Sequence, residues 1–178
     1  MRARKKTAWV EYLEPEDLPY LSQQIEPREW YPMETYERMG LALLREVAGG
    51  HLNLVYHWGR HTVEGLRVAH PDLFVEGDIR ETLMRFQTLR ASLFDFPAVE
   101  VESIRDGASR FLVDYGMSPD AEEAATHQFI GFLERTLEEA GARDIRIEVP
   151  KQSWRGDPVT RVIARWSPAA SGEAVRRA

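Results

Sequence analysis

The stretch from His57 to Glu64 carries the residue types and spacing that best fit a metal site. His57 and His61 are four residues apart, so on a helix both imidazoles and Glu64 share one side, and two such imidazoles can bind one metal ion. The order His-Glu-x-x-His and a third ligand fixed by the sequence are both absent. On a helical wheel these three side chains lie opposite the apolar residues, which is typical of a solvent-exposed helix face. On such a face Arg60 and Glu64 would form an i,i+4 ion pair. We therefore predict no metal and keep His57 and His61 as candidates only.

The apolar face of the same predicted helix contains a second candidate. Trp58 and Gly59 lie on it, and Gly65 follows within the helix. Each glycine costs about 1 kcal/mol relative to alanine inside a helix, so their presence indicates the close approach of a neighbouring helix or of something bound. Trp58 and Gly59 are therefore predicted ligand-binding residues.

Arg90 interrupts the apolar face of the helix predicted over residues 79–94. A charge in such a place is unfavourable unless it is paired. In one interpretation the stem packs and the guanidinium reaches the surface or an acid. In the other, Arg90 binds an anionic group inside a pocket, which would make it a third ligand-binding residue.

No other pattern in the sequence supports catalysis. The chain has no Gly-x-Ser-x-Gly elbow and no Gly-x-x-x-x-Gly-Lys loop. It has no cysteine, which excludes disulfides and thiolate ligands. The paired acids Glu122–Glu123 and Glu138–Glu139 fall on helix positions that we predict to be exposed. We predict no catalytic residue and no cofactor, and we prefer a non-enzymatic function.

The charge balance limits the partners. The net charge of −6 and a pI near 5.5 disfavour nucleic acid, which needs a clustered positive face, and an anionic membrane surface. The basic residues 1–6 precede no apolar segment of the kind found in secretory signals. No apolar run approaches the roughly 20 residues of a membrane span. We expect a cytoplasmic protein.

One domain is expected over residues 8–166, between a disordered basic tail at 1–7 and a flexible tail at 167–178. Ala8–Leu13 is rich in strand formers and is assigned to an edge strand rather than a helical turn, and Glu14–Asp17 is predicted to start a helical turn. Trp30 and Tyr31 are predicted to anchor the chain on the core, with ligand stacking as the alternative.

Helical spacing of apolar residues predicts helices over 33–48, 52–69 and 79–94. Gly49 and Gly50 would end the first helix, and Asp78 would cap the third. Alternation then predicts strands over 99–104 and 110–115, joined by the turn Asp106-Gly107. A long helix opens at Ser118 and Pro119 and closes at Gly141, and strands over 144–149 and 159–166 follow. The fold class is therefore α+β: N-terminal helices, then an antiparallel sheet of four to five strands built as hairpin, long helix and hairpin.

Three stretches carry a family resemblance: Leu13–Asp17, Trp30–Met33 followed by Tyr36–Glu37, and Glu139–Asp144 leading to Arg161–Trp166. With the element order, they resemble a bacterial family without assigned activity. That family lies within or near the superfamily of haem nitric-oxide-binding domains, 4-vinyl-reductase ligand-binding domains and subunits of the TRAPP vesicle-tethering complex. The resemblance covers about Leu13 to Trp166. It implies a role in sensing a small molecule or in protein interaction, and a homodimer paired through helices.

The haem-binding branch of that superfamily uses a proximal histidine and a Tyr-x-Ser-x-Arg motif, and this sequence has no Tyr-x-Ser-x-Arg. Three hypotheses follow. The first is a non-enzymatic regulatory domain that binds a small apolar ligand, a protein partner, or both. The second is a haem or metal sensor that uses His57, His61 or His127. The third is an enzyme for an anionic, apolar substrate with Arg90 as the anion-binding residue.

Overall fold

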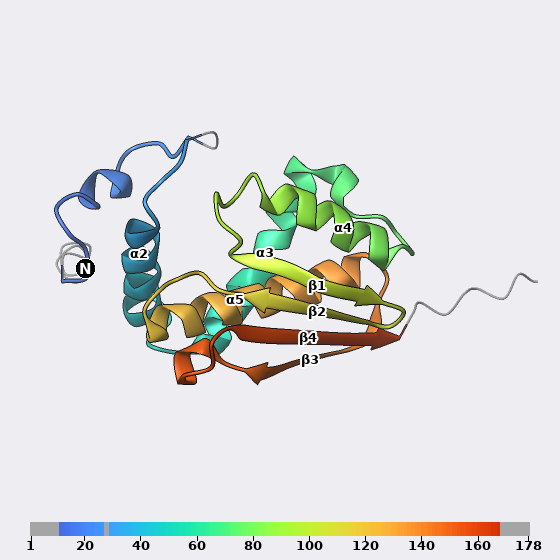
Figure 1. Cartoon of the computed structure of the whole chain (residues 1–178). Helices are drawn as coiled ribbons and strands as arrows, with labels where there is room; N and C mark the ends of the chain where they lie inside the picture. Colours follow the sequence, from blue (N-terminus) through green and yellow to red (C-terminus); the bar gives the residue numbers. More distant parts are fainter. Residues whose placement is uncertain (1–10, 27–28, 168–178) are drawn as a thin grey trace, which may run out of the picture.

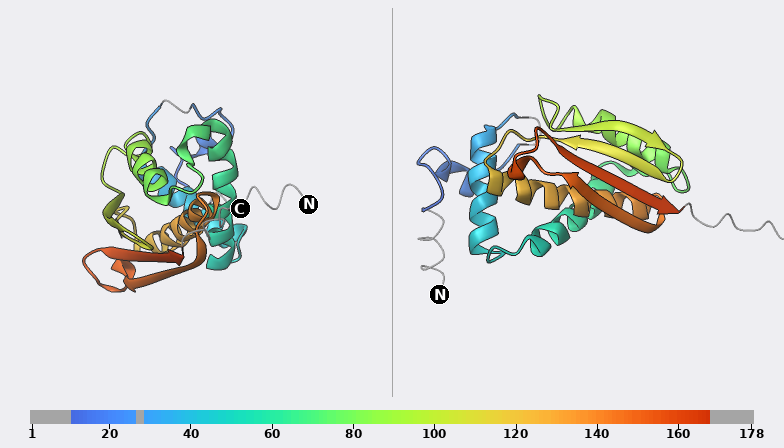
Figure 2. Two further views of the ribbon diagram at one scale, coloured as in Figure 1. Left: turned by 90° about the vertical axis from the view of Figure 1, so that its right-hand side faces the viewer. Right: turned by 60° about the horizontal axis from the view of Figure 1, so that its bottom comes forward.

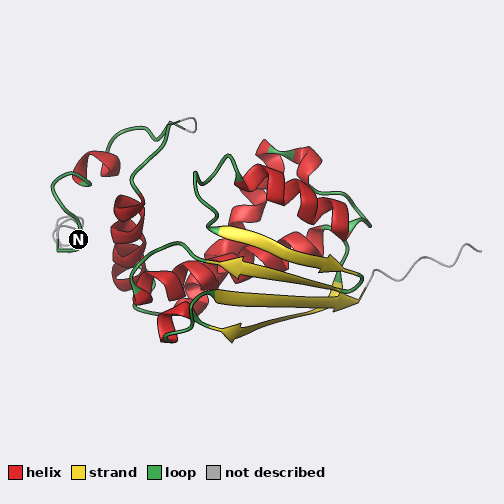
Figure 3. Cartoon of the chain, in the orientation of Figure 1, coloured by secondary structure: helices red, strands yellow, loops and turns green. Residues whose placement is uncertain are grey.

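A four-stranded antiparallel sheet and two crossed helices organise the chain (Figures 1 and 3). The computed structural model describes residues 11–26 and 29–167. The strands are β1 (Val99–Arg105), β2 (Ala108–Val113), β3 (Arg143–Lys151) and β4 (Thr160–Ser167), in the order β1-β2-β4-β3. The predicted α+β class with hairpin, long helix and hairpin is confirmed.

The helices are α2 (Met33–Glu46), α3 (Leu52–Ala69), α4 (Ile79–Arg90) and α5 (Pro119–Glu139). Short 3-10 turns lie at Leu18–Leu21, Pro71–Leu73 and Ser153–Arg155. Helix α5 lies behind the sheet and α3 crosses it on the far side, while α2 stands across the N-terminal end of α5 (Figures 1 and 2). The predicted helix at 79–94 ends four residues early, because residues 91–93 form a turn.

The main core lies between one face of the sheet and helices α4 and α5. Its fully buried side chains include Phe111 and Val113 of β2, Leu83 of α4, and Leu133 and Leu137 of α5. The rings of Phe111 and Phe129 meet edge to face at 5.5 Å. The other face of the sheet is charged, with cross-strand ion pairs Arg161–Glu102 and Arg165–Glu148.

The two ends of the described chain correct the sequence predictions. Glu11 and Tyr12 form a turn and Leu13 belongs to no strand, while the rest of Ala8–Leu13 lies outside the described residues, as do 1–7 and 168–178. A hydrogen-bonded turn over Glu14–Asp17, in which the Asp17 N–H donates to the Glu14 carbonyl at 2.9 Å, leads directly into the first 3-10 turn at Leu18. Trp30 is 61% exposed, so it does not anchor the chain on the core.

Asp17 fastens this N-terminal segment to α2. Its carboxylate is fully buried and accepts hydrogen bonds from Arg38 Nε at 2.6 Å, Arg38 Nη2 at 2.9 Å and Thr35 Oγ1 at 2.7 Å. The backbone N–H of Glu14 also donates to it at 2.9 Å. The Arg38 guanidinium holds the pKa of Asp17 well below its ordinary value, against the opposing effect of burial.

Glycines bring α3 and α5 into backbone contact. A Cβ on Gly59 would overlap the carbonyl oxygen of Gln128 and would lie 2.8 Å from its carbonyl carbon. A Cβ on Gly131 would overlap the carbonyl of Tyr56 in the same way. Of the two explanations for the glycines of α3, close approach of a helix is the one seen at Gly59. At Gly65 a Cβ would meet nothing within 4 Å, so that glycine has no such role here.

Arginines of α3 pair with acids of α5 beside this crossing. Arg60 binds Glu138 at 2.8 Å and Glu134 at 3.3 Å, and Arg67 binds Glu139 at 2.8 Å. The predicted Arg60–Glu64 pair is therefore wrong, since Glu64 pairs with His61 instead. Glu138 and Glu139 are partly buried ion-pair partners rather than freely solvated charges.

We expect Gly59→Ala and Gly131→Ala each to lower the free energy of unfolding by about 1–3 kcal/mol or more, because backbone must move to admit the methyl group. Gly65→Ala is the matched control and should raise it by roughly 0.5–1 kcal/mol, through helix propensity alone. Urea titrations of the three variants measure this. An equal change in the free energy of unfolding in Gly59→Ala and Gly65→Ala would contradict the backbone contact between α3 and α5 at Gly59.

Asp17 should make stability depend on pH. Because the folded state lowers its pKa, its contribution is present above the ordinary value of 3.8 and is lost as pH falls toward the folded value. Asp17→Asn should therefore be less stable than wild type at neutral pH, and this deficit should shrink on acidification. The exposed Asp72→Asn is the control for removal of a surface carboxylate, and its urea midpoints are measured at the same pH values. A deficit that is constant with pH would count against the ion pair.

Candidate ligand-binding site

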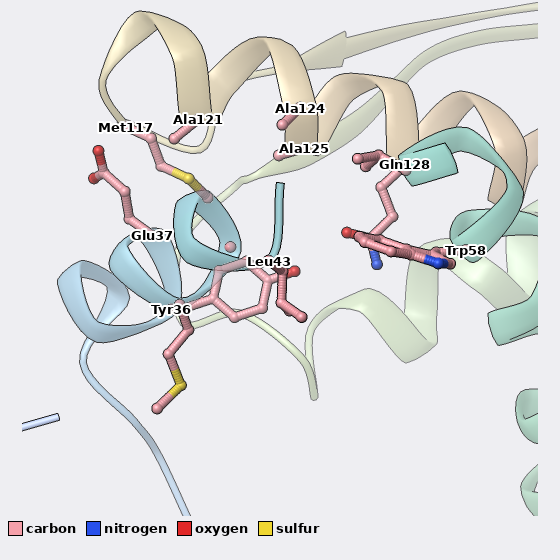
Figure 4. Close-up of a pocket in the computed structure, with 12 residues that line it drawn as sticks. Tyr36, Glu37, Leu43, Trp58, Met117, Ala121, Ala124, Ala125 and Gln128 are labelled. Atoms are coloured by element: carbon pink, nitrogen blue, oxygen red, sulfur yellow. The ribbon is translucent and has the colours of Figure 1, made fainter. Parts of the chain in front are cut away.

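A pocket of about 440 Å³ lies where α2 meets the crossed helices (Figure 4). Four segments line it: α2, α3, the loop before α5, and the first half of α5. The lining residues are Tyr36, Glu37, Met39, Gly40, Leu43, Val55, Trp58, Met117, Ala121, Ala124, Ala125 and Gln128.

The space exists because small and large side chains face each other across it. Ala121, Ala124 and Ala125 of α5 leave room that Leu43 of α2 and Trp58 of α3 do not fill. Trp58 and Gln128 lie at one end of the pocket, and Glu37 and Met117 lie at the other (Figure 4). The lining is mostly apolar with a few polar groups, which is the usual composition of a small-molecule site.

Glu37 ties α2 to the start of α5. Its Oε1 accepts a hydrogen bond from the backbone N–H of Ser118 at 3.0 Å and another from the Ser118 hydroxyl. Ser118 is the N-cap residue of α5, but its side chain makes no capping hydrogen bond to the helix. Glu37, the only charged side chain of the pocket lining, therefore already has hydrogen-bond partners. The same contact holds α2 against the N-terminal end of α5.

Glu122 fixes the loop that carries Met117 into the pocket. It is 3% exposed and accepts the backbone N–H groups of Tyr115 at 3.0 Å and Met117 at 3.2 Å. Burial raises the pKa of Glu122 in spite of these hydrogen bonds, which act in the opposite direction. The prediction that Glu122 is an exposed helix charge is wrong, because the chain turns back over the first turn of α5.

The three predicted ligand-binding residues do not come together. Trp58 lines the pocket, whereas Gly59 is covered by α5 at the helix crossing. Arg90 is partly buried and donates from Nη1 to the carbonyl oxygen of Phe96 at 3.4 Å, while its buried Nε has no partner in the described structure. It lines none of the five pockets described. Arg90 thus bridges the turn after α4.

The histidines lie away from the pocket. His57 and His61 are exposed on α3, with His61 Nδ1 3.1 Å from Glu64. His127 is half-buried on α5, and burial lowers its pKa. Within 11–26 and 29–167, no three His, Asp or Glu side chains gather in a way that could hold a metal ion.

Sequence reasoning missed most of the lining. The alanines at 121, 124 and 125 follow helical spacing, but small residues on a face also pack in ordinary cores. Tyr36 and Leu43 are 48% and 38% exposed although they belong to the apolar pattern of α2. The pocket arises because α2 lies across the N-terminal end of α5 (Figure 2). This placement is a property of the tertiary structure, and no local sequence pattern indicates it.

Solved structures that share this fold include H-NOX domains. The H-NOX protein of S. oneidensis in its Fe(II)NO ligation state is 14% identical, with a TM-score of 0.60, and the match covers 91% of this chain and 89% of that one. A structure on haem distortion in the H-NOX family is 13% identical, with a TM-score of 0.60 and coverages of 96% and 97%. A mutant of T. tengcongensis H-NOX is 14% identical, with a TM-score of 0.55 and coverages of 94% and 98%.

The resemblance to the haem nitric-oxide-binding superfamily is therefore confirmed at the level of the fold. No protein-family model matches the chain, and no curated protein matches it in sequence. None of the helices in the described part of the chain combines the length and hydropathy of a membrane span.

The pocket does not fit a histidine-ligated haem. Protein haem is held by His, Cys, Met or Tyr side chains, and of these the pocket offers Tyr36, Met39 and Met117. None of the lining residues is an arginine, lysine or histidine that could neutralise the propionates.

We expect Glu122→Gln to lower the free energy of unfolding by roughly 1–3 kcal/mol, since one of two buried N–H groups loses its acceptor. Because Glu122 has a raised folded pKa, its ionisation weakens folding as pH rises through that value. Glutamine cannot ionise, so the free energy of unfolding of the variant does not fall in this way. The difference between wild type and variant should therefore be smaller at about pH 8 than at about pH 4. Glu123→Gln is the control for charge removal, and urea titrations at both pH values supply the comparison.

Proposed function

We propose that this chain is a ligand-binding sensor domain that takes a small apolar molecule into the pocket between α2, α3 and α5. The supporting observation is an open, mostly apolar pocket whose walls come from separate elements. The shared H-NOX fold is consistent with it, since the solved neighbours include an Fe(II)NO-ligated protein.

The apolar surface of the pocket favours occupancy. Burying apolar area contributes roughly 25 cal/mol per Å², and Tyr36, Leu43 and Trp58 present such area while partly exposed. A ligand that covers these side chains removes them from water. Val55 and the alanines of α5 add an apolar floor.

Ligand binding would act on α2. This helix is joined to α5 by Glu37–Ser118 and by the exposed ion pair Arg45–Asp120. A ligand in the pocket contacts α2 on one side and the α3–α5 pair on the other, so it favours the arrangement in which both touch it. This is the physical basis for a sensor rather than a storage site.

The test is binding of N-phenyl-1-naphthylamine, a neutral apolar probe whose fluorescence rises on transfer from water. We expect saturable binding to the wild type. Ala125→Phe should weaken it at least about tenfold, or 1.4 kcal/mol, because the ring fills the pocket. Val68→Ala, at an 85% exposed position of α3, is the control. Affinity that is unchanged in Ala125→Phe would refute this site.

A haem sensor is the second candidate, and the H-NOX likeness favours it over the partner-binding and enzyme alternatives. His127 is its best ligand candidate, because burial lowers its pKa and so keeps the imidazole neutral for binding. This candidate requires a stoichiometric Soret band on titration with hemin that His127→Ala removes. A band lost only in His57→Ala or His61→Ala would place the iron on the exposed face of α3.

Homodimer formation remains a prediction. Gly59, part of its motivation, is covered by α5, which leaves Gly65 and the exposed Val68 as the part of α3 where a second copy could approach. Light scattering at micromolar concentration tests it, and the mass of one chain would count against it.

The enzyme alternative relies on Arg90 as the residue that binds an anionic substrate. Arg90 lines none of the described pockets, so this alternative has no site in the described structure.

A further inference from the structure

The electrostatics of the pocket define the class of ligand, if the proposed ligand site is correct. Of its twelve lining residues, one carries a formal charge at neutral pH, and that one is the carboxylate of Glu37. We infer that the pocket selects uncharged, largely apolar molecules that carry a hydrogen-bonding group, and that it rejects anionic ones such as carboxylates and sulfonates.

The surrounding helices supply no free cation to the pocket. Helices α2, α3 and α5 contain five arginines and no lysine. Each of the five is paired with an acid: Arg38 with Asp17, Arg45 with Asp120, Arg60 and Arg135 with Glu138, and Arg67 with Glu139. An anionic ligand would have to break one of these pairs or remain unpaired.

An unpaired anion in this place is unfavourable for two reasons. Transfer of a charged group from water into an apolar site is costly unless a partner replaces the lost hydration. The carboxylate of Glu37 adds repulsion, and the nearby hydrogen-bond donors, the N–H and hydroxyl of Ser118, already donate to Glu37. Both effects act on fatty-acid carboxylates and on haem propionates alike.

Gln128 supplies the neutral polar contact. Its side chain projects beside Trp58 at one end of the pocket (Figure 4), and the hydrogen bonds among the described residues include none to its amide. The amide offers two N–H donors and one carbonyl acceptor. It can therefore bind a carbonyl, hydroxyl or amine of a ligand whose apolar part lies on Trp58 and the alanines of α5.

The experiment compares two probes with the same aromatic rings. N-phenyl-1-naphthylamine is neutral, and 1-anilinonaphthalene-8-sulfonate adds one sulfonate anion. We expect the wild type to bind the neutral probe at least about tenfold more tightly. Gln128→Arg places an unpaired cation in the pocket and should reverse the preference. Gln128→Leu, which is uncharged, is the matched control and should retain the preference for the neutral probe.

Each outcome is decisive. Equal or tighter binding of the sulfonate by the wild type overturns the inference but leaves the proposed ligand site standing. Failure of both probes to bind refutes the proposed function itself. If Gln128→Arg does not fold, competition on the wild type decides. The inference predicts that hemin, which carries two propionates, does not displace the bound neutral probe from the pocket, and displacement at one equivalent overturns it.

Discussion

The close approach of α3 and α5 is the constraint on which the rest of the structure depends. At Gly59 and Gly131 the two backbones touch, so neither helix can shift or rotate without collision. The crossing sets Arg60 against the acids of α5, and it places Trp58 above the alanine floor. Helix α5 in turn carries the core onto the sheet through Phe129 and Leu133. The glycine contact between α3 and α5 thus determines how the sheet, the helices and the pocket are placed relative to one another.

Local periodicity predicted the second half of the chain well. The Asp106-Gly107 turn, the alternation of Phe111, Val113 and Tyr115, and the long helix all follow from short-range rules. The irregularities did not follow from such rules. A register shift between Val101 and Ser103 changes the phase of β1 and turns Ile104 toward the core, where simple alternation had placed Ser103.

The candidate site was only partly predictable. Trp58 was identified from its place on a helix face, and Gly59 was identified as a point of close approach, but the approaching body is α5 rather than a ligand. Arg90 broke its pattern because it bridges to Phe96. Glu122 looked like a solvated charge, because a sequence does not show that the preceding loop folds back onto it. The pocket itself requires α2 to stand at the end of α5, which no local pattern encodes.

The placement of α2 has a thermodynamic consequence. Helix α2 is attached to the rest of the chain by the Glu37–Ser118 contact, by the exposed Arg45–Asp120 ion pair and by a small apolar cluster in which Leu44 and Ala48 meet Val55 and Ala124. Because this cluster is much smaller than the main core, α2 should open at lower free energy than that core. Any molecule bound between α2 and α5 is lost when α2 opens, so occupancy and docking of α2 are linked equilibria. At a concentration of one hundred times Kd, this linkage contributes about 2.7 kcal/mol to the closed state. Amide exchange within Met33–Glu46 would then report how much of the pocket is filled.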